Sequence, residues 1–197
     1  MTDRSKLVYE HTKSKLNFLL HDLSGGPQKA MLAQLRRGVG RKPGEIPELW
    51  GAFLEGLPDA LCGSGGNPSR TEWAIYVALT LFAAHQQGRD PSAEPMNREG
   101  CRFGSAIAQL ITDENERERI IRRFNIVATA SEMPELAHHL RGAVQLLRGD
   151  GIPVDYAELA KDLYWYQAVD YRSNVRLRWG EDFYRQLNKT GKEETDG

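Results

Sequence analysis

Residues 69–87, S-R-T-E-W-A-I-Y-V-A-L-T-L-F-A-A-H-Q-Q, form the stretch that decides the fold. The first four residues have a capping-box pattern, in which Ser69 caps a helix and Glu72 reaches back to the Ser69 backbone. The following residues are apolar on all sides of a helix, which is typical of a helix buried at the centre of a domain. Gly88 ends the pattern. The rest of the chain must therefore cover this helix.

Helical patterning continues through most of the chain, and the alternation typical of strands is almost absent. We therefore predict an all-α fold with about nine helices. Their approximate ranges are 5–20, 28–37, a short helix after Pro47, 70–87, 98–111, 113–130, 133–148, 156–169 and 173–188. Ser131 and Asp155 have the residue types of helix N-caps, and Thr112 has the same role before the sixth helix.

The connections change in character near Thr112. Loops before it are long and rich in glycine, whereas those after it are short. We predict two helical domains: 1–111 with a basic surface, and 112–197 as a four-helix antiparallel bundle. The polar tail from Lys189 is expected to fray.

Composition excludes several protein classes. The chain has 197 residues, a net charge of -1 and 40% hydrophobic residues, so neither a polybasic tail protein nor a disordered chain fits. Cys62 and Cys101 are the only two cysteines, which is too few for a disulfide framework. They also lie too far apart in sequence for the spacing of a zinc site. The longest apolar stretch is too short to cross a membrane, and the N-terminus has no signal-peptide pattern. We expect a cytoplasmic protein.

Catalytic motifs are missing. The chain has no dinucleotide-binding, P-loop, zinc-protease or nucleophile-elbow pattern. The glycine-rich residues 63–66 are interpreted as a flexible loop, because no lysine follows and no strand precedes them. Glu135 and His138 form half of the motif found in di-iron bundles, but no second copy exists, and both are expected to point to solvent. We therefore predict no catalytic residue, no cofactor and no metal.

Arginine dominates the basic residues, with 18 Arg against 8 Lys. Arginine suits bidentate contact with phosphate, although an arginine-favouring genome explains the excess equally well. No acid lies between Asp22 and Glu45, and this stretch contains five cations: Lys29, Arg36, Arg37, Arg41 and Lys42. A helix dipole explains cations at a helix C-terminus but not the continuing run. The segment therefore predicts contact with nucleic-acid phosphates.

Further arginines form rows on the predicted helices after Thr112. Spacing predicts that Glu116 pairs with Arg119 and Glu118 with Arg122. Each row alone is typical of a solvated face, but several rows together can hold a nucleic-acid backbone without reading its sequence. The first row is Arg119, Arg122 and Arg123, and the second is Arg141 and Arg148. The third is Arg178 and Arg185, which are expected to lie on the helix face opposite Trp179 and Phe183.

Seven segments in a fixed order resemble a known family. They read A-Q-L-R-R (33–37), I-P-E-L-W (46–50), R-F-G-S-A-I-A (102–108), E-R-I-I-R-R-F (118–124), L-R-G-A-V-Q-L-L-R (140–148), D-Y-A-E-L-A-K-D-L (155–163) and W-G-E-D-F-Y (179–184). No segment is specific alone, but over residues 28–185 their order and spacing resemble CasB, the small subunit of the type I-E CRISPR interference complex, Cascade.

The resemblance implies a non-enzymatic, two-domain subunit that stabilises the R-loop. Its implied partners are the guide RNA, the target DNA with its displaced strand, the repeated backbone subunit, the large subunit and a second copy placed head to tail. The implied contact residues include Arg36 with Arg37, Arg119 or Arg123, and Arg141. Some members carry Arg at the position of Ser105; here Arg102 is expected to substitute from one turn earlier. The alternative is a protein–protein scaffold whose arginines pair with partner carboxylates.

Overall fold

The computed structural model describes residues 3–21 and 26–193, and in these ranges the chain is helical without any β-strand. The all-α prediction is confirmed. The helices are α1 (Arg4–His21), α2 (Pro27–Arg37), η1 (Pro47–Leu49), α3 (Trp50–Leu54), η2 (Asp59–Leu61), α4 (Arg70–His85), α5 (Phe103–Ala108), α6 (Glu114–Thr129), α7 (Met133–Asp150), α8 (Tyr156–Tyr166) and α9 (Val169–Glu193). None of the described helices is both long and apolar enough to cross a membrane.

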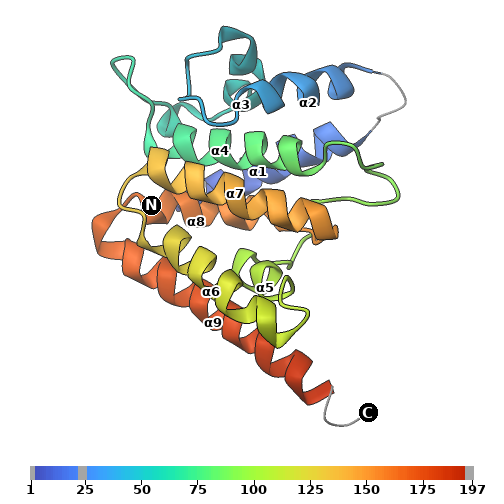
Figure 1. Cartoon of the computed structure of the whole chain (residues 1–197). Helices are drawn as coiled ribbons and strands as arrows, with labels where there is room; N and C mark the ends of the chain where they lie inside the picture. The colour runs from blue at the N-terminus through green and yellow to red at the C-terminus, as the bar shows by residue number, and fades with distance from the viewer. Residues whose placement is uncertain (1–2, 22–25, 194–197) are drawn as a thin grey trace.

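Helix α4 is the centre of the core, as predicted. Its capping box is complete: the Glu72 backbone N–H donates to Ser69 Oγ over 3.1 Å, and the Ser69 N–H donates to Glu72 Oε2 over 2.6 Å. Every residue from Ala74 to Ala83 is buried. Helices α1, α2, α3, α7 and α8 pack around α4 (Figure 1).

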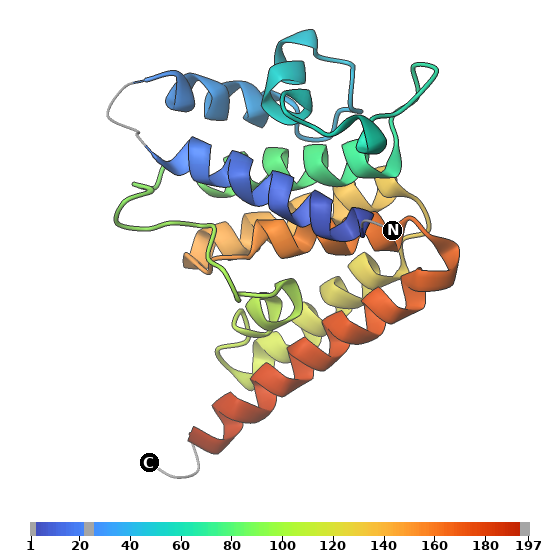
Figure 2. The ribbon, with the colours of Figure 1, turned by 180° about the vertical axis from the view of Figure 1, so that it is seen from behind.

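The helices after Thr112 do not pack only with one another. Helix α8 packs on α1 and α4, α7 packs on α4, and α9 packs on α5 (Figure 2). The reason is that α4 is apolar on all sides, so helices from both halves are needed to bury it. The expected C-terminal bundle is thus shared with the N-terminal half, and the division between residues 111 and 112 stays a prediction.

Helix α5 is shorter than predicted because its expected first residues, 98–102, form a turn and irregular backbone instead of a helix. The Arg98 N–H donates to Val154 O over 3.2 Å, and the Asp155 N–H donates to Cys101 O over 2.7 Å. These hydrogen bonds link the stretch before α5 to the connection between α7 and α8. The partner residues lie more than 50 positions away in sequence, so local helical periodicity gave no sign of them.

Two predicted caps lie one residue away from the observed ones. Asp113, not Thr112, caps α6, and its Oδ1 accepts from the Glu116 N–H over 3.0 Å. Glu132, not Ser131, precedes α7. The cap at Asp155 is confirmed by a 2.9 Å hydrogen bond from the Glu158 N–H. Helix α9 continues past Lys189 to Glu193, and the last four residues lie outside the described ranges.

His85, at the end of α4, makes the fold sensitive to acid. The ring is fully buried, and its Nδ1 lies 2.9 Å from Tyr156 Oη. Burial lowers the pKa of His85 to about 4, from an ordinary value of 6.5. Because the unfolded chain takes up this proton first, stability is fully present above pH 6.5 and is lost as pH falls toward 4.

We expect the unfolding free energy of wild type to fall more steeply with decreasing pH than that of the variant His85→Gln. From pH 6.5 to pH 4, wild type should lose about 3 kcal/mol of unfolding free energy relative to the variant, at 1.36 kcal/mol per pKa unit. Urea unfolding at half-unit pH steps measures this difference. A constant difference over that range would contradict the assignment to His85.

Candidate nucleic-acid interface

The structure brings predicted cations from α2 and α7 to one groove. Two adjoining hollows of about 330 and 150 Å³ lie over the C-terminal end of α4 and share Arg36 and Gln87. Leu81 and Ala84 of α4 line the smaller one. In Figure 1, α4 lies between α2 and α7. We define the basic groove by the cations that line it: Lys29, Arg36, Arg89, Arg141 and Arg148.

The end of α2 is fixed to α4, which places Arg36 over the groove. Tyr76 Oη donates to the Gly38 carbonyl over 3.0 Å, and burial raises the pKa of this phenol to about 12. A Cβ at Gly38 would lie 2.7 Å from both Tyr76 Oη and Leu49 Cδ1. Only glycine therefore lets the helix end approach α4 so closely.

The loop after α2 meets α7 at Gly40. This residue has φ +80°, a conformation that favours glycine, and a Cβ there would lie 3.8 Å from Arg141 Nη1. Arg141 therefore lies beside the loop that carries Arg41 and Lys42. Arg41 is 3.9 Å from Glu45, whereas Lys42 is exposed and unpaired within the described part of the chain.

Arg89 is a groove residue that the sequence analysis missed. Its Nη2 donates to the Arg148 carbonyl over 2.7 Å, and its Nη1 forms a 2.7 Å ion pair with Glu94. It thereby fixes the end of α7 to the loop after α4. The sequence shows Arg89 only as a cation after Gly88, the residue that ends the helical pattern. Its contact with Arg148 could not be predicted, because Arg148 lies 59 positions away.

The groove cations contributed by α2 and α7 have no acidic partner. Within residues 3–21 and 26–193, no carboxylate lies within 4 Å of the charged groups of Lys29, Arg36, Arg141 or Arg148. Arg37, which follows Arg36 in sequence, is exposed and likewise has no ion pair within the described ranges. Unpaired cations gathered in one groove attract phosphates and release counterions on binding.

Arg102 and Arg178 differ from this group because they hold the fold together. Arg102 lies 3.5 Å from Asp182 and 3.9 Å from Glu158. Arg178 was placed opposite Trp179 by the sequence analysis, but the two side chains donate to the same Asp162 carboxylate. Helical periodicity assigns faces only approximately, and neighbouring residues can reach one buried partner.

Asp162 is the buried acid at the centre of this arrangement. Burial raises the pKa of its carboxyl to about 6, while Arg178 and Trp179 act in the opposite direction. Trp179 is 1% exposed, and its Nε1 donates to Asp162 Oδ2 over 2.6 Å. This pair is therefore part of the contact between α8 and α9.

Helix α6 carries a separate set of arginines. The predicted local pairs are confirmed: Arg119 pairs with Glu116, and Arg122 pairs with Glu118 over 2.7 Å. Arg123 is exposed and lines a different hollow, of about 350 Å³, together with His138 and His139. The structure thus does not bring the α6 arginines into the basic groove.

The half-motif at Glu135 and His138 is exposed, as predicted. Glu135 accepts hydrogen bonds from the Ser131 N–H and Oγ, and it lies 3.8 Å from His139. Among the described residues, no three His, Cys, Asp or Glu side chains are grouped so that they can hold a metal ion.

The sequence and the fold are similar to those of known proteins. The family model for CRISPR-associated protein Cse2 matches residues 31–184. The chain belongs to the CRISPR-associated Cse2 family. CasB of Thermobifida fusca is similar to it, with 31% identity, 91% of this chain and 96% of that chain covered, and a TM-score of 0.72.

Other solved structures share the fold of this Cse2 protein. CasB of M. ruber has 25% identity over 93% of this chain and 98% of that chain, with a TM-score of 0.67. A chain of a CRISPR RNA-guided surveillance complex has 23% identity over 95% of this chain and 99% of that chain, with a TM-score of 0.73. Comparison with curated proteins gives no match.

Proposed function

We propose that this Cse2 protein is a non-catalytic small subunit of a CRISPR RNA-guided surveillance complex for antiviral defence. In this role the basic groove holds a nucleic-acid backbone and stabilises the R-loop. The observation that carries the proposal is the placement of four unpaired cations, Lys29, Arg36, Arg141 and Arg148, around one groove.

Backbone contact is enough for such a subunit. In RNA-guided complexes, base pairing with the guide reads the sequence, so the protein needs only to hold phosphates. A net charge of -1 with a local basic groove suits a weak grip within an assembly. The proposed ligands are the guide RNA–target region and the displaced DNA strand. The proposed protein partners are the repeated backbone subunit, the large subunit and a head-to-tail second copy.

Binding of labelled single-stranded DNA and RNA, measured by fluorescence anisotropy at several salt concentrations, tests the proposal. We expect sequence-independent binding with a negative salt slope of about 0.7 per phosphate contact. The double variant Arg36→Ala/Arg141→Ala should bind about tenfold or more weakly. Its salt slope should also be reduced by about 1 to 2, because two phosphate contacts are lost.

The matched control is Arg117→Ala/Lys161→Ala, which removes the same charge away from the groove, where both cations already have acidic partners. We expect this variant to keep its salt slope. If both double variants lose the same amount of affinity, net charge alone drives binding. Wild type that does not bind at low salt would favour a protein–protein scaffold instead.

A further inference from the structure

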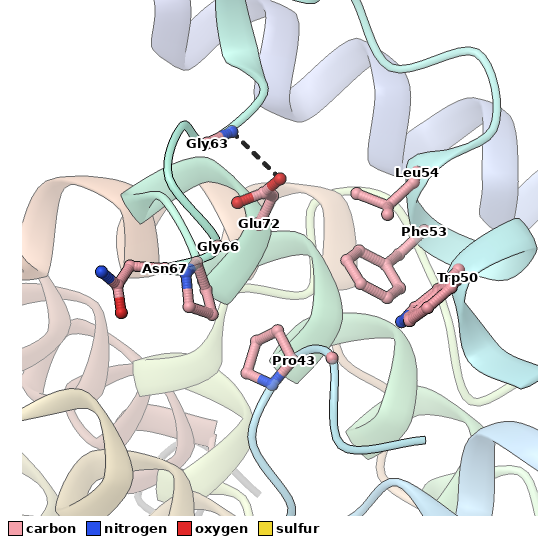
Figure 3. A pocket seen from close by; sticks show the side chains of 10 residues that line it. Pro43, Trp50, Phe53, Leu54, Gly63, Gly66, Asn67 and Glu72 are labelled. Atoms are coloured by element: carbon pink, nitrogen blue, oxygen red, sulfur yellow. Dashed lines mark hydrogen bonds between the residues drawn. The ribbon is translucent and has the colours of Figure 1, made fainter. Parts of the chain in front are cut away.

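A hollow of about 240 Å³ lies beside α3, separate from the basic groove, and we call it the Trp50 hollow. It is lined by Trp50, Phe53, Leu54 and Pro43 on its apolar side and by Glu72 on its polar side (Figure 3). Trp50 is 48% exposed, although it is among the largest apolar side chains of the chain. A half-exposed tryptophan at an apolar hollow is typical of an energetically important residue of a protein interface.

The glycine-rich loop at residues 63–66 forms a wall of this hollow and holds the Glu72 carboxylate. The Gly63 N–H donates to Glu72 Oε1 over 3.0 Å, and the Ser69 N–H donates to Oε2 over 2.6 Å. A Cβ at Gly63 would lie 2.6 Å from Oε2, so glycine is needed for this approach. The carboxylate thus uses the Gly63 and Ser69 N–H groups, which cannot also bind a phosphate there.

Glu72 keeps acceptor capacity for a ligand. A carboxylate has about four lone-pair sites, and the two backbone hydrogen bonds use two of them. The side chain is partly exposed at the hollow. A donor that enters the hollow can therefore bind the carboxylate without breaking the capping box of α4.

The surroundings of the hollow are acidic. Residues 43–69 contain Glu45, Glu48, Glu55 and Asp59 but no lysine or arginine. All four acids are exposed. Among residues 3–21 and 26–193, ion pairs within 4 Å are formed by Glu45 with Arg41 at 3.9 Å and by Glu55 with Lys15 at 3.8 Å, and not by Glu48 or Asp59. The acids of this segment favour a cation at the hollow, and the nearest cations in sequence, Lys42 and Arg70, lie just outside it.

We propose that the Trp50 hollow binds an arginine side chain of a partner protein. An arginine side chain suits this lining, because a guanidinium can stack on an indole such as that of Trp50 and can donate to a carboxylate such as that of Glu72. The volume is below the range of pockets for drug-sized ligands, which suits a single side chain. This site goes beyond the proposed nucleic-acid function, and its test needs no nucleic acid.

The test is a titration of the full chain with N-acetyl-arginine amide, followed in a two-dimensional ¹H–¹⁵N NMR spectrum. We expect the Trp50 indole N–H and the Gly63 and Gly66 amide signals to shift and saturate, with a Kd of about 1 mM for so small a probe. N-acetyl-citrulline amide has the same shape without the charge. It should bind at least about tenfold more weakly if the carboxylate and indole recognise a cation.

Two variants separate the hollow from general surface binding. Trp50→Ala should weaken the arginine response of the Gly63 and Gly66 signals at least about tenfold. Tyr171→Ala removes another aromatic side chain that is also 48% exposed, and it should change the response less than about twofold. Unchanged signals far from α3 would show that both variants remain folded.

Four results would overturn the proposal. The first is the absence of a saturable shift with the arginine probe, and the second is an equal response to the citrulline probe. The third is a stronger response of the same signals to adenosine monophosphate, which would assign the hollow to a nucleotide. If these signals instead depend on protein concentration without any probe, the occupant is a second copy of the chain, and the proposed partner is wrong.

Discussion

Gly104→Ala is expected to destabilise this Cse2 protein by about 3 kcal/mol or more. Gly104 is buried in α5 where this helix packs on α9. An added Cβ would lie 3.0 Å from the Trp179 carbonyl carbon and 3.1 Å from the Phe183 nitrogen, and closer still to the Trp179 oxygen. These are backbone atoms of a helix, so they cannot rotate away as a side chain can. The two helices must separate instead.

Urea unfolding at pH 7 measures this effect, and Gly142→Ala is the matched control. Gly142 lies inside α7, and a Cβ there would meet no atom within 4 Å. Alanine is the better helix former, so we expect this variant to gain about 0.5–1 kcal/mol. If the two variants change the unfolding free energy by the same amount, close packing at Gly104 is not the cause.

Asp162→Ala is expected to lose about 3 kcal/mol of unfolding free energy. The change leaves the Arg178 guanidinium and the buried Trp179 Nε1–H without their shared acceptor. Breaking a buried ion pair costs about 3–5 kcal/mol, and the lower end applies because the Arg178 side chain is 33% exposed and can turn partly toward water. Denaturant unfolding at pH 7 measures the loss.

Two further variants test this reason for the loss. Glu118→Ala breaks the exposed pair with Arg122 and should change stability by less than about 0.5–1 kcal/mol. Adding Arg178→Met to Asp162→Ala removes the unpaired charge and should restore part of the lost stability. An Asp162→Ala loss as small as that of Glu118→Ala would mean that this pair does not stabilise the contact between α8 and α9.

These two predictions concern contacts between helices that could not be predicted from the sequence. The same is true of the contacts that form the basic groove. Arg36 and Arg141 stand more than 100 positions apart, and the sequence assigned each to a basic helix face. The structure places both at one hollow because α2 and α7 pack on α4. In contrast, Arg178 belongs to a row with the same helical spacing but is bound to Asp162.

Local patterns identified the class of fold and much of its organisation. The apolar residues 69–87 predicted the central helix, and the capping residues Ser69 and Asp155 predicted two helix starts correctly. These features depend on contacts within a few residues, which sequence periodicity records directly. The order and spacing of the seven segments between residues 33 and 184 also indicated the family.

The sequence by itself determined an all-α chain with a fully buried central helix and an acid-free basic segment at residues 23–44. Tertiary structure alone decided which cations remain unpaired, that Arg89 joins the basic groove, and that the glycine-rich loop forms a wall of the Trp50 hollow. The physical reason is that helical spacing fixes the face on which a side chain lies. Its partner is set by the packing of α4 against helices from both halves of the chain.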